Sequence, residues 1–97
     1  MSMYNPPHPG EFIREVYMEP FGLSSRKVAK NLDVAPSTII RLLNGKGNVT
    51  TEMALRLSRV FGRSPENWLA MQDHYSLRHV KQKINLKDLK KLELAVV

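Results

Sequence analysis

Four polar residues stand at helical spacing in one short stretch of the chain. Ser37, Thr38, Arg41 and Asn44 follow Pro36, and residues three or four positions apart fall on one side of an α-helix. Their hydroxyl, guanidinium and amide groups complement the donors and acceptors that base edges present in the major groove of DNA. The pattern predicts that these four residues read base pairs, with Arg41 donating two parallel bonds to a guanine.

Residues 25–43 have the spacing of two short helices that cross around a tight turn. Ala29 is a small residue where the second helix must pack, Val34 plugs the turn, and Ile39 anchors the second helix. We expect these three side chains to point inward and the polar residues between them to point outward. Residues 36–43 are the predicted recognition helix, which also carries Ile40, Leu42 and Leu43.

Positive charge gathers around this stretch. Residues 24–63 hold eight lysines and arginines against Asp33 and Glu52, and the whole chain has a net charge of +6. A basic surface attracts polyanions because binding releases counterions from phosphates, although a solvated surface with no such partner can also be basic. One set of residues at helix ends and loops is predicted to contact the DNA backbone and fix the register: Ser24, Ser25, Arg26, Pro36, Lys46, Asn48 and Thr50.

Caps, prolines and glycines mark the remaining helices. One should run from Pro9 to Pro20, one between Thr50 and Gly62, and one from Ser64 to about Lys83. The tail spaces its leucines by three residues, and its form is ambiguous. The sequence therefore predicts an all-α bundle of five helices, or six if the tail is helical, in one domain over residues 1–97, with residues 23–64 as the helix-turn-helix core.

Apolar residues outside the core segment have two interpretations. Phe12, Ile13, Val16 and Tyr17 make one helical face, and Trp68, Leu69, Gln72 and Tyr75 make another. The aromatic residues Phe12, Tyr17, Phe21 and Trp68 either close a small core or form an exposed site for a partner. The stronger interface candidates are Leu86, Leu89, Leu92, Val96 and Val97, so residues 65–97 are expected to mediate dimerisation.

Other kinds of chemistry have little support in the sequence. The chain contains no cysteine, and His8, His74 and His79 are too dispersed for a metal site. No nucleophile elbow or phosphate-binding glycine loop occurs, so we expect no catalytic residue and no cofactor. No apolar run is long enough to span a membrane, and the N-terminus does not resemble a signal peptide, so we expect a cytoplasmic protein.

Residues 23–64, LSSRKVAKNLDVAPSTIIRLLNGKGNVTTEMALRLSRVFGRS, resemble the helix-turn-helix domain of the lambda-repressor and Cro-like (XRE) superfamily. The flanking segments HPGEFIREVYMEPFGLS and SPENWLAMQDHYSL resemble the HigA/VapI antitoxin family, so that the resemblance covers residues 8 to about 80. The chain departs from the family at two positions. Asp33 replaces the usual turn glycine, and Ala35 replaces the usual serine cap of the recognition helix.

The resemblance implies a dimer that binds a palindromic operator upstream of its own toxin–antitoxin genes and represses them. It also implies a partner toxin, commonly an mRNA-cleaving ribonuclease, that the protein neutralises. The alternative is a stand-alone transcriptional regulator with no toxin. A protein-interaction module that binds no DNA is disfavoured because the outward face around Arg41 is polar and basic.

Overall fold

Three of the helices begin after a residue whose side chain caps a free backbone amide. In this computed structural model, which describes residues 6–95, the side chains of Ser24, Thr50 and Ser64 accept hydrogen bonds from the backbone N–H three residues further on. The helices that follow are α2 (Ser25–Leu32), α4 (Thr51–Phe61) and α5 (Pro65–Lys83). The predicted caps and the predicted end near Lys83 are confirmed.

The first helix starts at the predicted proline but changes its winding halfway. The α-helical turn α1 (Pro9–Ile13) continues without a break into the π-helical segment η1 (Arg14–Met18), in which Glu19 N–H donates to the Arg14 carbonyl at 2.9 Å. A π-helix bonds five residues back instead of four, which rotates the following side chains. The predicted grouping of Val16 on one face with the buried Ile13 is therefore wrong: Val16 is 42% exposed, whereas Met18 is buried.

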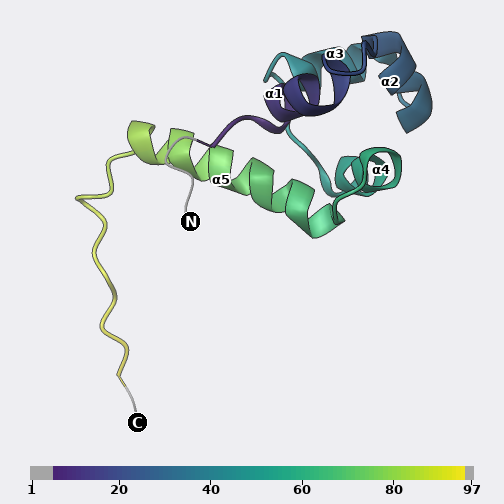
Figure 1. The fold of residues 1–97 in the computed structure, drawn as a ribbon. Coiled ribbons are helices and arrows are strands. Elements are labelled where there is room, and N and C mark those ends of the chain that lie inside the picture. Colours follow the sequence, from purple (N-terminus) through teal and green to yellow (C-terminus); the bar gives the residue numbers. More distant parts are fainter. Residues whose placement is uncertain (1–5, 96–97) are drawn as a thin grey trace.

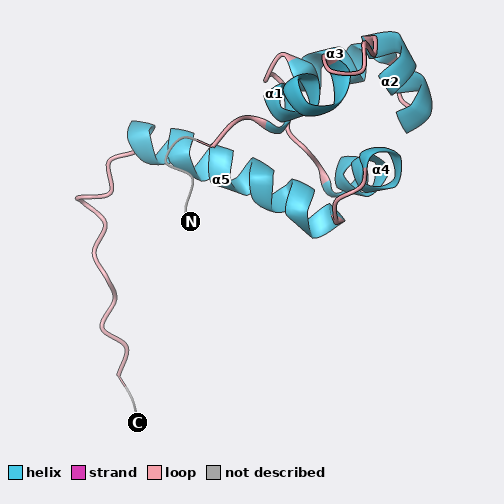
Figure 2. Ribbon diagram, viewed as in Figure 1, coloured by secondary structure: helices cyan, strands magenta, loops and turns pink. Residues whose placement is uncertain are grey.

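The helix-turn-helix consists of α2 and α3 (Pro36–Leu43) and lies beside α1 (Figure 1). Helix α4 packs against α2 and α5, and α5 is the long helix that passes beneath the others (Figure 1). Figure 2 shows helices joined by short loops, with no strand among residues 6–95. The predicted all-α class with five helices is confirmed when α1 and η1 are counted as one.

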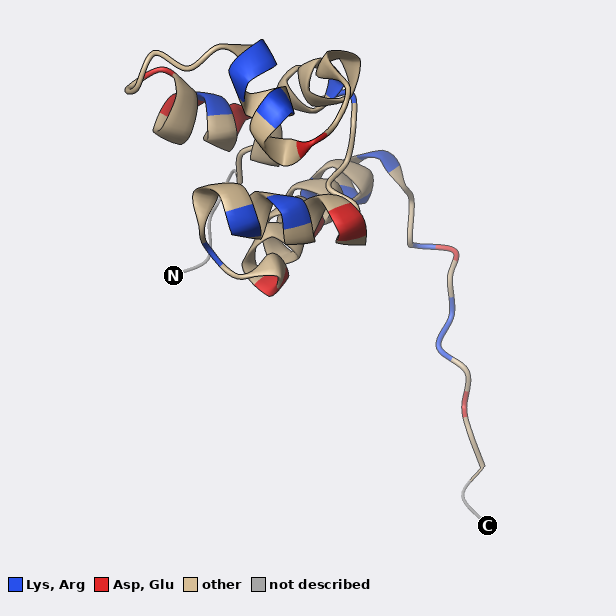
Figure 3. Cartoon of the chain, turned by 90° about the vertical axis from the view of Figure 1, so that its right-hand side faces the viewer, with Lys and Arg blue, Asp and Glu red and all other residues tan. Residues whose placement is uncertain are grey.

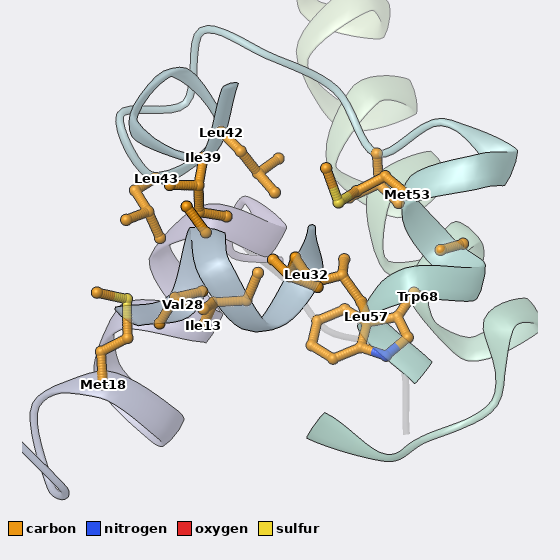
Figure 4. Packing of buried hydrophobic residues seen from close by; sticks show 13 residues of the cluster. Ile13, Met18, Val28, Leu32, Ile39, Leu42, Leu43, Met53, Leu57 and Trp68 are labelled. Atoms are coloured by element: carbon orange, nitrogen blue, oxygen red, sulfur yellow. The ribbon is translucent and has the colours of Figure 1, made fainter. Parts of the chain in front are cut away.

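The core lies where these helices meet. Ile13, Val28, Ile39, Leu57 and Trp68 come from five different segments and are buried together (Figure 4). Ala29 is also buried and Val34 packs against the cluster, so the three predicted inward positions of the helix-turn-helix are confirmed. Burying these side chains supplies most of the driving force for folding.

The aromatic residues divide between the core and the surface. Phe12, Tyr17 and Trp68 pack around one another, with ring centroids about 6 Å apart, which confirms the core interpretation for these three. Phe21 follows the π-helical segment in a turn and is 71% exposed, so the core interpretation is wrong for this residue.

The C-terminal segment leaves the helical body as an extended chain (Figure 1). Residues 84–95 contain one turn, closed by Leu89 N–H on the Leu86 carbonyl at 3.1 Å, and no helix. The sixth helix is therefore absent from this segment. Leu86, Leu89 and Leu92 are exposed there, whereas Val96 and Val97 lie outside the described residues.

Candidate nucleic-acid interface

The conformation of Asp33 and hydrogen bonds from Val34 and Arg56 fix the turn between α2 and α3. Asp33, which replaces the usual turn glycine, adopts the left-handed conformation (φ 57°, ψ 48°). Val34 N–H donates to the Ala29 carbonyl at 3.1 Å. From α4, Arg56 donates to the carbonyls of Leu32 and Asp33 at 2.7 and 3.1 Å. These bonds satisfy carbonyls that the end of a helix leaves free, and they fix the angle at which α3 leaves the turn.

The recognition helix presents one buried and one exposed side. Ile39, Leu42 and Leu43 are buried, whereas Ser37, Thr38 and Arg41 are exposed. These three exposed residues line one hollow together with Asn48 from the loop before α4. The helix starts with Pro36 and no side-chain cap, because residue 35 is alanine. In its first turn, Pro36 has no N–H, and Thr38 N–H donates to the Ala35 carbonyl at 3.0 Å.

Asn44 lies apart from the other predicted base-reading residues. It forms the C-cap of α3, and its Oδ1 accepts a hydrogen bond from Arg14 at 3.5 Å. Arg14 also donates to the Leu43 carbonyl, so this arginine of η1 closes the end of the recognition helix. The structure thus brings Ser37, Thr38 and Arg41 together and places Asn44 on a neighbouring hollow, with Leu43 and Ser25.

The predicted backbone-contacting residues lie at the starts of α2 and α3 and in the loop that leads to α4. Ser24 and Thr50 use their hydroxyl oxygens as caps, which leaves each hydroxyl hydrogen free to donate. Ser25 is half-buried at the start of α2 and lines the hollow that contains Asn44. The remaining members of the set are exposed: Arg26, Pro36, Lys46 and Asn48.

Basic residues are spread over the helices and the tail, with acidic residues between them (Figure 3). Two arginines of residues 24–63 are engaged by other parts of the chain. Arg56 binds the turn carbonyls, and Arg63 donates to Tyr17 and Asn67 at 3.3 and 3.0 Å while lying over the Phe12 ring. Sequence reasoning counted both in the basic patch, because the distant partners of an arginine have no local signal.

Gln72 supports the interface from α5, a role that the sequence did not reveal. Its buried side chain accepts from Val49 N–H at 2.8 Å and donates to Asn48 Oδ1 at 3.3 Å and to Ser76 Oγ at 3.0 Å. The predicted inward face of α5 placed Gln72 correctly, but two of its three partners, Val49 and Asn48, are 23 and 24 residues away. Gln72 therefore holds the loop that carries Asn48 beside the recognition helix.

His8 forms the start of α1, although sequence reasoning considered it only as a metal ligand. Its Nδ1 accepts from Gly10 N–H at 2.9 Å, and the edge of the ring meets Tyr75 with centroids 4.8 Å apart. Burial lowers the pKa of His8, and the nearby Gly47 carbonyl and Glu11 carboxylate oppose this only in part. The neutral ring is required here, because a protonated Nδ1 could not accept the bond. The sequence His-Pro-Gly before a helix is a usable signal for such a cap.

A metal site and a membrane-spanning helix place different requirements on the described residues. Among residues 6–95, no three histidine, aspartate or glutamate side chains are grouped so that they could hold a metal ion. Over the same residues, no helix has the length and apolar character that crossing a membrane requires.

The chain resembles DNA-binding regulators over most of its length. The helix-turn-helix family model matches residues 13–68. An uncharacterized HTH-type transcriptional regulator of Escherichia coli, YddM, is 40% identical over 92 residues, which are 95% of this chain and 97% of the relative. Virulence-associated protein I of Dichelobacter nodosus is 44% identical over 82 residues, which are 81% and 76% of the two chains.

Solved structures of antitoxins have the same fold. Antitoxin GraA in complex with its operator is 33% identical, with a TM-score of 0.81 over 100% of this chain and 98% of that one. The antitoxin HigA of Pseudomonas aeruginosa with the higBA promoter is 30% identical, with a TM-score of 0.77 over 81% and 86%. The chain therefore belongs to the helix-turn-helix family of the lambda-repressor and Cro-like type and, within it, to the HigA/VapI-type antitoxin family.

Proposed function

We propose that the chain is the antitoxin of a type II toxin–antitoxin system. In this role it binds operator DNA, represses its own operon and neutralises a partner toxin that cleaves mRNA. The observation that carries the proposal is the exposed polar face of α3, where Ser37, Thr38 and Arg41 share one hollow, in a chain that matches an operator-bound antitoxin along its whole length. Such a protein acts in the cytoplasm, where it meets both the operator and the toxin.

Recognition divides between two groups of residues. Ser37, Thr38, Arg41 and Asn44 contact base edges, and Arg41 is the residue best suited to a guanine. Contacts to the DNA backbone come from the flanking set of Ser24, Ser25, Arg26, Pro36, Lys46, Asn48 and Thr50. The support is that all of them except the half-buried Ser25 are exposed, and that the hydroxyl hydrogens of the two caps, Ser24 and Thr50, remain free to donate.

The protein acts as a two-fold dimer on a palindromic operator. Its two recognition helices then lie about 34 Å apart, which is one turn of DNA. Leu77, Val80 and Ile84 near the end of α5 are exposed, and so are the leucines of the tail. Burying these apolar side chains against a second copy of the chain would remove them from water, which favours association. Truncation after residue 80 should therefore give a monomer in analytical ultracentrifugation, and a truncated dimer would contradict this placement.

The first test is a fluorescence anisotropy titration at physiological salt. The duplex immediately upstream of the chain's own gene is compared with a scrambled duplex of the same composition. Specific repressors exceed their non-specific binding by at least about a thousandfold. A preference of that size supports the operator-binding role. Equal, weak and salt-sensitive binding of both duplexes contradicts it.

Two alanine variants test the division between reading and positioning. Arg41→Ala should weaken binding of the upstream duplex by about 1–3 kcal/mol per half-site and relax the preference at one base pair. Lys46→Ala should weaken all duplexes equally and flatten the dependence of affinity on salt. If the two variants behave alike, the proposed division of roles is wrong.

A stand-alone transcriptional regulator is the second candidate, favoured by the similarity to YddM over nearly the full length of both chains. The distinguishing experiment expresses the gene adjacent to the chain's own gene, with and without the chain. Growth arrest that the chain relieves, together with a complex of the two proteins in a pull-down, supports the antitoxin. A harmless neighbour that forms no complex, combined with selective operator binding, supports the regulator.

A further inference from the structure

The outward side of the recognition helix contains one apolar residue. Ile40 is 44% exposed, whereas Ile39, Leu42 and Leu43 around it are buried. It follows Ser37 by three positions and precedes Asn44 by four, so the helical repeat places it on the side of α3 that carries these polar residues.

Core packing does not account for an isoleucine at this position. The exposed part of Ile40 opens onto a hollow that is also lined by Leu23, Ser25 and Asn44, at the edge of the proposed DNA-binding surface. Isoleucine is a weaker helix former than alanine, leucine or glutamine because its branched Cβ restricts the side chain in a helix. The part of its apolar side chain that is exposed to water also contributes no stabilising free energy. Neither helix formation nor the core therefore accounts for the exposed part of this side chain.

We propose that Ile40 determines operator sequence by contacting the C5-methyl group of a thymine in the major groove. The inference rests on the operator-binding function proposed above. The thymine methyl is the distinctive apolar group on the major-groove edge of the base pairs, and serine, arginine and asparagine cannot match it. Packing Ile40 against this methyl group removes apolar surface of both molecules from water, while Arg41 supplies the hydrogen bonds to a neighbouring base pair.

A double-mutant cycle between protein and DNA tests the contact. The wild-type chain and Ile40→Ala are titrated by anisotropy against the upstream duplex and against the same duplex with deoxyuridine in place of thymine. Loss of one buried methyl group should weaken wild-type binding about fourfold, and about 15-fold if both half-sites carry the contact. Ile40→Ala should bind the thymine duplex more weakly by a similar factor and should lose most of its response to deoxyuridine.

Two further variants keep the result interpretable. Leu55→Ala removes an equally apolar side chain of α4 that is 57% exposed and lines a hollow with Asn31 and Arg59, outside the proposed DNA-binding set. This variant should respond to deoxyuridine as the wild type does. If circular dichroism shows that Ile40→Ala is unfolded, Ile40→Val replaces it and should show a reduced response.

The outcomes separate this inference from the function on which it rests. If the wild type and the Ile40 variant lose the same factor on the deoxyuridine duplex, another residue such as Thr38 reads the methyl group and the proposal is overturned. It is also overturned if the wild type prefers the upstream duplex but does not respond to deoxyuridine. If the wild type shows no preference over a scrambled duplex, operator binding fails, and the role of Ile40 fails with it.

Discussion

Among residues outside the proposed DNA-binding set, Gln72 is the one whose substitution should most disturb the candidate nucleic-acid interface. Its amide oxygen satisfies the buried N–H of Val49, and its amide nitrogen binds Asn48 and Ser76. The substitution Gln72→Met keeps the length and nearly the volume of the side chain but removes all three hydrogen bonds. Val49 N–H then remains buried without a partner, because the backbone of this loop belongs to no helix.

The cost follows from the burial of that N–H group. A buried donor that loses its acceptor costs about 1–3 kcal/mol of folding free energy. In a domain of this size, each kcal/mol lowers the melting temperature by about 4–8 °C, so Gln72→Met should melt about 4–24 °C lower. The measurement is thermal unfolding followed by circular dichroism.

Ser76→Ala is the matched control. It removes only the bond from Gln72 to the Ser76 hydroxyl and leaves Val49 satisfied, so it should cost no more than about 1 kcal/mol. Below its melting temperature, Gln72→Met should also lose affinity for the operator duplex and for the scrambled duplex by the same factor. The reason is that Asn48, which Gln72 holds in place, is proposed to contact the DNA backbone. A Gln72→Met protein as stable as Ser76→Ala would refute the reasoning.

Three further changes test the framework around the recognition helix. In Gly10→Ala the new Cβ would lie 1.9 Å from the Leu42 carbonyl oxygen, so urea unfolding should show a loss of about 3 kcal/mol or more. Asp33→Gly should raise stability in the same assay by about 0.5–1 kcal/mol, because glycine adopts the left-handed conformation without strain. The lowered pKa of His8 means that the unfolded chain takes up a proton more readily than the folded one. The contribution of His8 to the free energy of unfolding should therefore be complete above the ordinary pKa near 6.5 and should decrease as the pH drops below that value. The variant His8→Asn keeps a capping side chain, so its melting temperature should depend less on pH between pH 5 and 8.

Features governed by neighbouring residues could be predicted from the sequence. The caps at Ser24, Thr50 and Ser64 each bind an amide three residues away, so the signal and the bond lie within one turn of helix. The left-handed Asp33 and the uncapped start after Ala35 were also readable as departures from the family pattern. The polar side of α3 followed from helical periodicity alone, which is why Ser37, Thr38 and Arg41 were found together.

Features that depend on distant contacts could not be predicted. The π-helical segment turns Val16 outward and Met18 inward, and nothing in the local pattern distinguishes it from an ordinary α-helix. Asn44 was grouped with the base-reading residues by spacing, but its contact with Arg14 depends on how η1 packs beside α3. The hydrogen bonds of the Gln72 side-chain amide to Val49 and Asn48 likewise form only once α5 lies against the loop before α4.

The same long-range contacts change how the charge of the chain should be interpreted. Arg56 directs its guanidinium to the carbonyls of the turn, and Arg63 directs its own to Tyr17 and Asn67, so both guanidinium groups already have partners within the protein. Lys46 is exposed on the loop after the recognition helix. Each phosphate that a protein neutralises contributes about 0.9 to the slope of log affinity against log salt concentration. The slope should therefore decrease by about this amount in Lys46→Ala and stay unchanged in Arg63→Ala, although the two substitutions remove the same formal charge. Equal slopes in the two variants would mean that net charge, and not the placement of each side chain, governs the affinity for DNA.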